Sequence, residues 1–373
     1  MTAGVSFEAF AERFEAEPGY LDFARMGPVG TTVLGEEQAM MTLLAHSRYG
    51  TLSTLDEQDA RVRDAVAAVI GFDPRQVSFQ PNTSQGLMHV MFGLTGEVAV
   101  SSADFPSSPF AITRAADALG AVSPRWLDSD HGRITPGNLR DQLTDSTVAV
   151  AVSLVDFRTG YVVDLEGIRQ VIGDRLLIVD AIQGFGIVDA PFQVADVVVS
   201  GGQKWVRAGW GTGFLALSDR AAEHLVPVFS GFSATDTEGT PLDEVPPPTR
   251  GVGAFEVSNP DPIAQARFAV ALEEIADVGV AVIAARLAEQ TARIIDMADE
   301  FALDVVSPRD DAERAGIVVV EPAADRLTAL TASLHNHGVT VTTRQGAVRL
   351  SPHVTTDDET FAMLRSSLVA YSV

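Results

Sequence analysis

The sequence predicts an α/β protein with a mostly parallel sheet covered by helices and a smaller α/β domain at the C-terminus. Three observations carry this prediction. Between residues 76 and 217, continuously apolar segments alternate with helical segments, which is typical of strands buried on both faces of a parallel sheet. A second, shorter alternation closes the chain. Hydrophobic residues make up 46% of the 373 residues and charged residues 20%, so the chain can bury a large core.

The expected elements follow from apolar spacing and from glycine or proline breaks. The N-terminal part should contain a helix over 6–17, a pocket-lining loop over 20–30, and helices over 32–46 and 55–70, the last closed by Gly71. The alternating region should contain strands at 76–80, 98–101, 122–127, 148–155, 176–180, 197–200 and 214–217, and helices at 84–94, 110–119, 139–143 and 165–172. A functional loop over 230–252 should precede a helical stretch over 262–301, interrupted near Gly279, and strands near 317–320, 339–343 and 347–351.

This pattern divides the chain into three parts. Residues 1–19 form a helix that joins the small domain, residues 20–255 form the large domain, and residues 256–373 form the small domain. The large and the small domain are each long enough to hold a hydrophobic core of their own.

Charge and cysteine content narrow the possible functions. The net charge is −24, and this field repels nucleic acid and anionic lipids, so we expect neither kind of partner. The chain has no cysteine, which excludes disulfides, thiolate metal sites and a cysteine nucleophile, and we expect no metal centre. We find no signal peptide and no apolar run that could span a bilayer, so we expect a cytoplasmic protein.

Lys204 is the most informative single residue, because it is the only lysine among 26 basic side chains. Arginine can form every salt bridge and solvated surface that lysine forms, but it cannot replace an amine that must lose its proton and attack a carbonyl. Lys204 follows the apolar run 197–199 and a turn of small residues, and a glycine-rich segment and a second apolar strand come after it. A leftover surface lysine is the alternative, but this setting favours a reactive amine.

Two other strand ends carry polar side chains. Asn82, Thr83 and Ser84 follow the strand at 76–80 and open a helix, which is a ready site for a phosphate, although an ordinary helix cap has the same sequence. Asp180 ends the apolar strand at 176–180, where a buried carboxylate needs a partner. An acid, an amine and a phosphate cradle at successive strand ends are what pyridoxal phosphate requires.

With these residues in place, the chain resembles the class V aminotransferase family of fold-type I pyridoxal-phosphate enzymes. The pattern is Asp180-x-x-Gln183, then Lys204 after a small-residue turn, then a glycine-rich segment. The resemblance is clearest over 76–214 and returns at 348–353. The family includes cysteine desulfurases, kynureninases, isopenicillin-N epimerases and ergothioneine-forming C–S lyases. The resemblance implies the fold-type I transferase fold and pyridoxal 5'-phosphate as the cofactor.

The resemblance also implies roles for single residues. Lys204 and Asp180 would be catalytic, as the Schiff-base lysine and the partner of the pyridinium nitrogen. The cofactor would further contact Thr83, Ser84, Phe105, Gln183, Gln203, Ser258 and Asn259. The substrate's α-carboxylate would be held by Arg349, with Arg158 and Arg25 as further substrate-side candidates. Ser258 and Asn259 match a segment that is lent to the partner's phosphate site, which implies a homodimer with shared active sites.

Several departures from the family and alternative interpretations remain. The chain lacks the cysteine of cysteine desulfurases, Gln203 replaces the tyrosine of kynureninases, and Phe157 stands where relatives often have asparagine. Phe105 could equally be a core residue, and Arg25 and Arg48 are more often structural arginines. We expect an aminotransferase-like enzyme acting on an amino acid or a derived substrate. The alternatives are a C–S β-lyase or an epimerase on the same scaffold, or a catalytically silent homologue.

Overall fold

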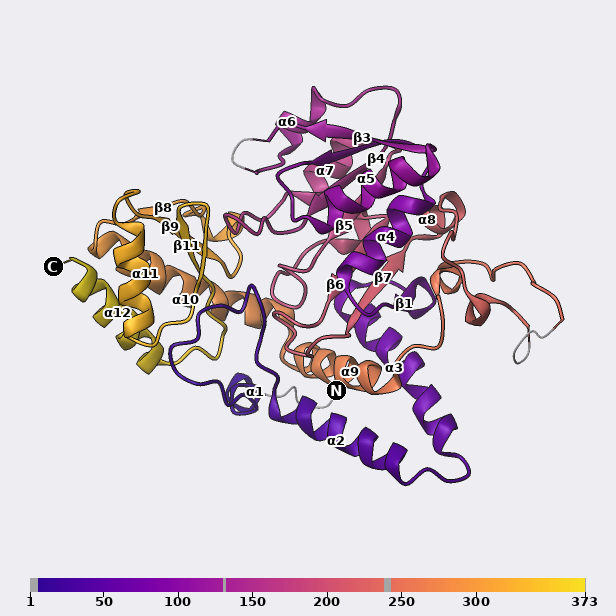
Figure 1. Cartoon of the computed structure of the whole chain (residues 1–373), viewed down its shortest axis with the longest axis horizontal. Coiled ribbons are helices and arrows are strands. Elements are labelled where there is room, and N and C mark those ends of the chain that lie inside the picture. Colours follow the sequence, from indigo (N-terminus) through magenta and orange to yellow (C-terminus); the bar gives the residue numbers. More distant parts are fainter. Residues whose placement is uncertain (1–5, 130–131, 238–242, 373) are drawn as a thin grey trace.

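The computed structural model describes residues 6–129, 132–237 and 243–372, and it confirms the predicted α/β class. Figure 1 shows two sheets side by side, with the larger sheet and its helices on one side and the C-terminal sheet with α11 and α12 on the other. Among the described residues, no helix combines the length and the apolar character that a bilayer crossing needs.

The larger sheet has seven strands in the order β1-β7-β6-β5-β4-β2-β3. Their bounds are β1 Val77–Phe79, β2 Gly96–Ser101, β3 Val122–Leu127, β4 Thr147–Ser153, β5 Leu176–Asp180, β6 Val197–Gly201 and β7 Gly213–Leu217. All neighbouring pairs from β6 to β3 are parallel, whereas β7 runs antiparallel to both β6 and β1. The sheet is therefore mostly parallel, as predicted, and its parallel strands point their carboxyl ends to one edge.

Helices cover both faces of this sheet. One face packs against α4 (Thr83–Gly93), α5 (Ser107–Leu119) and α8 (Asp219–His224). The other packs against α3 (Thr51–Ile70), α7 (Leu165–Ile172) and α9 (Pro262–Val278). In β5, Ile178 points to the first face while Leu177 and Val179 point to the second. The strands β5, β6 and β7 are buried at every position and are mostly apolar, because both of their faces are covered.

The smaller sheet is antiparallel, with the order β10-β11-β9-β8. Its strands are β8 Asp304–Val305, β9 Val318–Glu321, β10 Thr342–Arg344 and β11 Ala347–Leu350. One face packs against α10 (Val280–Glu300), α11 (Leu327–Asn336) and α12 (Asp358–Ser372). Val348 and Leu350 belong to this core and Arg349 faces the other way, as strand alternation requires.

Several expected helices differ in extent: α3 begins at Thr51 where the sequence predicted 55, and α5 begins at Ser107 where it predicted 110. The helix expected over 6–17 is only α1, Phe7–Ala11, because the chain then turns and Phe14 packs 3.8 Å from the Arg207 guanidinium carbon. The helix expected over 139–143 is α6, Pro136–Arg140, which begins earlier because Thr135 caps it and Pro136 occupies its first turn.

The N-terminal segment ties the two sheets together. Tyr20 and Asp22 form isolated bridges to Thr340 and Ser351, and Leu21 is part of the small sheet's core. α9 packs against α3 and against α2 (Thr31–Ala45), and the core of the small sheet begins at Ile294 on α10. The domain boundaries at 19–20 and 255–256 stay a prediction.

Candidate active site

Lys204 lies in the connection between β6 and β7, at the carboxyl edge of the large sheet. The connection is closed by a hydrogen bond from the Gly202 N–H to the Thr212 carbonyl, 2.9 Å. Gly27 of the N-terminal loop lies directly against it, and a Cβ at that position would overlap the Lys204 carbonyl oxygen. The loop predicted over 20–30 thus packs on the lysine segment.

Arg207 fixes the turn that follows the lysine. Its backbone has a positive φ of 61°, which costs of order 1 kcal/mol for a residue other than glycine. Its buried guanidinium donates hydrogen bonds to the Pro28 carbonyl and to Thr355 Oγ1, the latter at 3.3 Å, and stacks over Phe14. The turn is therefore held by the N-terminal segment and by the small domain together.

The Lys204 amine is buried among groups that favour its neutral form. The side chain is 8% exposed, and Nζ lies 5.3 Å from the centre of the Phe105 ring. Burial lowers the pKa of Lys204 to about 8; the charges of Arg349 and Arg344 act in the same direction, and Asp180 opposes them. An amine with this pKa is far more nucleophilic at neutral pH than an ordinary lysine.

Asp180 lies at the end of β5, 4% exposed, with its Oδ1 accepting a 3.0 Å hydrogen bond from the Ile182 N–H. Burial raises the pKa of Asp180 to about 7, and the neighbouring Asp104 adds to the effect while Lys204 opposes it. Asp104 is held by Ser153, whose Oγ donates to Asp104 Oδ1 at 2.5 Å, and burial raises the pKa of Asp104 to about 6. Ser153 is also the register partner of Asp180 across β4 and β5.

A polar cradle lies at the start of α4. Thr83 is buried, and its Oγ1 has no hydrogen-bond partner among the described residues. A Cβ at Gly201 would overlap Gln203 Oε1 and lie 3.2 Å from Thr83 Oγ1, so both side chains flank this glycine. Ser84 Oγ lies 2.7 Å from Ser107 Oγ, where α4 and α5 begin. An unpartnered hydroxyl at a helix N-terminus fits an anionic group such as phosphate.

Gln183 is buried, and both ends of its amide are engaged within the protein. Its Nε2 donates to the Ala24 carbonyl at 2.9 Å, and its Oε1 accepts from Trp205 Nε1 at 3.0 Å. Gln183 therefore links the N-terminal loop to the residue that follows Lys204, and a contact with a cofactor oxygen stays a prediction.

A cleft of about 980 Å³ opens beside this site and is lined by residues from 102–159 and from 306–349. Arg349 lies at its floor, with Nη2 3.3 Å from Asp22 Oδ1 and Nη1 donating to the Phe157 carbonyl at 3.4 Å. These contacts are long, and Arg349 Nε has no partner among the described residues. Burial lowers the pKa of Arg349, and the nearby Arg344 and Arg25 act in the same direction. The guanidinium can therefore accept a further anion.

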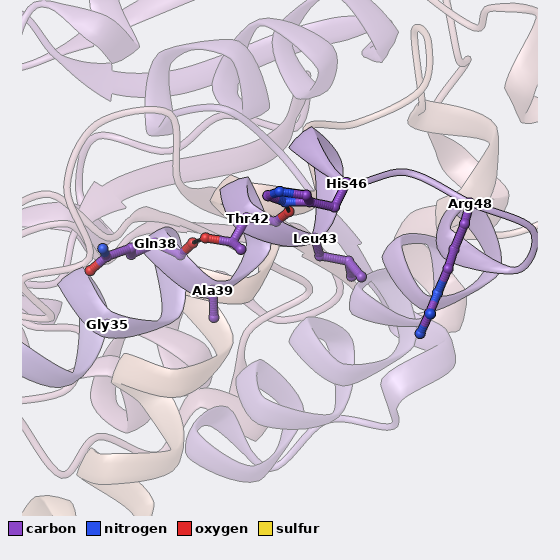
Figure 2. Close-up of a pocket in the computed structure, with 7 residues that line it drawn as sticks. All are labelled: Gly35, Gln38, Ala39, Thr42, Leu43, His46 and Arg48. Atoms are coloured by element: carbon purple, nitrogen blue, oxygen red, sulfur yellow. Dashed lines mark hydrogen bonds between the residues drawn. The ribbon is translucent and has the colours of Figure 1, made fainter.

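The other predicted arginines differ in position. Arg158 lines the cleft, whereas Arg25 is exposed on the N-terminal loop, near enough for its charge to influence Arg349. Arg48 is exposed beyond the end of α2 and lines a different, shallow hollow of about 690 Å³ (Figure 2). Ser258 and Asn259 are exposed between the short helical turn Val252–Phe255 and α9.

Sequence reasoning missed three residues of this site. Arg344 lines the cleft, Asp22 faces Arg349, and Asp104 lies close to Asp180. Asp104 directly precedes Phe105 in the sequence, but no role was predicted for it. The signal for Arg344 was its place in the hairpin that leads to Arg349. Thr342 is the cross-strand partner of Arg349, and Arg344 lies two positions further along the same strand, so the two arginines share a face.

The fold, the buried lysine and the polar cradle define a site of the fold-type I class. The model of the aminotransferase class V family matches residues 26–373, so the chain belongs to this family, and the family predicted from the sequence is confirmed. Pyridoxal phosphate, the cofactor predicted from the sequence, is the cofactor of this family.

The chain is similar to several known proteins. It is 24% identical to the uncharacterized aminotransferase YcbU of Bacillus subtilis, over 80% of this chain and 79% of that protein. The apo structure of a cysteine desulfurase from Thermococcus onnurineus superposes with a TM-score of 0.85 at 20% identity, covering 98% of each chain. The cystine C–S lyase C-DES, in complex with its product cysteine persulfide, has a TM-score of 0.82 at 20% identity, covering 94% of this chain and 98% of the other. These structural likenesses show the fold.

Proposed function

We propose that the protein is a pyridoxal-phosphate-dependent enzyme that transforms an amino acid or a derived substrate, as aminotransferases of class V do. The observation that carries the proposal is Lys204: the only lysine of the chain is buried at the carboxyl edge of the sheet, and its pKa is lowered to about 8. A chain that otherwise uses arginine keeps its one amine where the surroundings make it a nucleophile and a base.

The described residues fit the cofactor. The unpartnered hydroxyl of Thr83, the N-terminus of α4 and the amide of Gln203 would hold the phosphate. Phe105 would lie against the ring, and Asp180 would face the ring nitrogen. When bound, the cofactor supplies an electron sink for negative charge at the substrate's Cα.

The chain's own groups then orient the substrate and move its protons. Arg349 binds the α-carboxylate, which directs the Cα–H bond toward the lysine side of the cleft. Lys204 Nζ, with a substantial neutral fraction at physiological pH, takes the proton from Cα and returns it. The Asp180 carboxylate is buried, so its charge is not screened by water and stabilises positive charge opposite it.

A C–S β-lyase is the second candidate, because the same first proton transfer can end in loss of a sulfur group. The chain has no cysteine, which excludes a persulfide on the protein itself. A cystine C–S lyase shares the fold, and the choice between transamination, elimination and epimerisation depends on side chains around the cleft.

A homodimer is part of the proposal. α2 projects from the foot of the large domain (Figure 1) and exposes Leu34, Met41 and Leu44 at spacings that place them along one side of the helix. A second copy of the chain would cover this stripe, and the exposed Ser258 and Asn259 are available to reach the partner's phosphate site.

The experiment that tests the proposal uses the lysine directly. The cofactor-loaded protein is reduced with borohydride and mapped by mass spectrometry, and the label should lie on Lys204. A label confined to the N-terminal amine would refute the assignment. Incubation of the loaded protein with single amino acids, followed by assays for 2-oxo acid, sulfide and racemised product, then separates the three outcomes.

A further inference from the structure

Phe157 lines the cleft and lies near three arginines. Its carbonyl accepts a hydrogen bond from Arg349 Nη1 at 3.4 Å. Its ring lies 5.4 Å from the Arg158 guanidinium carbon and 6.0 Å from that of Arg344. Phe157 therefore holds two cationic side chains near one aromatic ring and a third at its backbone.

A row of contacts connects this group with the reactive amine. The Phe157 ring meets Phe105 edge-on, with 5.3 Å between centres and 90° between planes. Phe105 in turn lies 5.3 Å from Lys204 Nζ. The Arg158 and Arg344 guanidinium groups are thus separated from the lysine by two aromatic rings, and the charge of Arg344 is near enough to influence both Lys204 and Arg349.

The segment that carries Phe157 is fixed by Asp156. One carboxylate oxygen, Oδ1, accepts hydrogen bonds from the Arg158 N–H at 3.0 Å and from the Thr159 N–H and Oγ1, both at 2.7 Å. The Gly160 N–H closes the turn on the Asp156 carbonyl at 2.8 Å. Because the turn is fixed, the backbone of Phe157 and Arg158 is held in place, and their side chains extend into the cleft from a defined point.

The charge balance of the cleft favours an anion. Arg349 already faces Asp22, whereas Arg344 forms no ion pair with any described carboxylate. Among the described residues, the acids lining the cleft are Asp104, which is held by Ser153, and Glu321 at the end of β9. A positive region inside a chain of net charge −24 directs anions to this place and repels them elsewhere.

We propose that the substrate is an amino acid whose side chain carries a second carboxylate. Arg349 binds the α-carboxylate, and Arg344 binds the second one, with Arg158 near the same aromatic ring. A guanidinium suits this role because its planar fork matches a carboxylate. The inference rests on the proposed function, because the cofactor at Lys204 defines which end of the substrate faces the amine.

The test measures binding and not turnover. Succinate, glutarate and butyrate have no amine, so calorimetric titration of each into the cofactor-loaded protein reports the carboxylate sites alone. The wild-type protein should bind the better dicarboxylate about tenfold more tightly than butyrate, as expected for one charge-assisted contact. Arg344→Gln should remove this preference and change butyrate affinity less than twofold. Arg344 is exposed in a hairpin, so its loss should not affect folding.

The matched control is Arg114→Gln, which makes the same charge change at an exposed position of α5. It should leave the preference for dicarboxylates intact. A wild-type protein without that preference, or without measurable binding of any of the acids, overturns the inference, as does an equal loss in the control. The visible absorbance of the cofactor on Lys204 is read in the same samples. Intact absorbance without dicarboxylate preference refutes only this inference, and absent absorbance refutes the proposed function.

Discussion

The ionisation of Lys204 offers the sharpest test of how the site works. A lysine in water has a pKa of 10.5, and the site lowers it to about 8. The difference corresponds to about 3 kcal/mol in favour of the neutral amine. At pH 7.5 about a quarter of the Lys204 amines should be neutral, against about one in a thousand for an ordinary lysine.

The assay exploits the single lysine. Protein labelled with ¹³C at lysine Cε gives one lysine signal, so its chemical shift against pH follows Lys204 without ambiguity. In the cofactor-free protein the midpoint should lie near pH 8, and in the urea-unfolded chain near 10.5. Asp180→Asn should lower the midpoint, because it removes a negative charge, and Arg349→Gln should raise it, because it removes a positive one.

The lowered pKa of Lys204 must also make the free energy of unfolding depend on pH. The folded pKa lies below the unfolded one, so the unfolded chain binds more protons between pH 8 and 10.5, and stability should rise with pH across this window. Lys204→Met should remove that slope. A folded-state titration midpoint near 10.5, or mutant shifts of the opposite sign, would refute the conclusion that burial and nearby charges lower the pKa of Lys204.

Three further outcomes are expected. Asp180→Asn should abolish turnover and should raise the free energy of unfolding of the cofactor-free protein at pH 8 by up to about 4 kcal/mol, measured by urea unfolding. Because the pKa of Asp180 is higher in the folded than in the unfolded protein, this gain should fade as pH falls from 7 to 4. Equal stability of the mutant and the wild type at pH 8 would contradict the prediction. Arg349→Lys should weaken binding of a substrate carboxylate without changing cofactor absorbance, since an ammonium lacks the bidentate fork; an amide analogue, whose binding should not change, is the control. Leu34→Glu with Met41→Glu should convert a dimer to a monomer in light scattering, and a wild-type monomer would contradict the homodimer.

The sequence predicted the large domain well because its strands are buried on both faces. Continuous apolar runs such as 197–199 are typical of interior strands, and this run lies in β6. The predicted end of the helix at Gly71 is also found, because this glycine has the left-handed conformation of a C-cap. Strand order and direction could not be predicted in the same way. The antiparallel direction of β7 depends on the compact connection around Lys204, which apolar periodicity does not encode.

The chemistry at strand ends was also within reach of the sequence, whereas contacts between the domains were not. Lys204 and Asp180 follow apolar strands, so their place at one edge of the sheet follows from parallel topology. The pairing of Arg349 with Asp22 joins residues 327 positions apart, and the position of Arg344 beside Phe157 depends on how the two domains meet. No local pattern carries that information.

Several features that oppose stability occur close together at the candidate active site. Lys204 and Asp180 are ionisable groups in a buried setting, Thr83 has an unpartnered buried hydroxyl, and Arg207 combines a positive φ with a buried charge. Each costs free energy that an apolar residue or a glycine would not. Asp180 ends β5, Thr83 begins α4, and Lys204 and Arg207 lie in the connection between β6 and β7. A bound ligand can pair with such charged and polar groups and offset their free-energy cost. Binding of the cofactor at this site should therefore stabilise the folded protein.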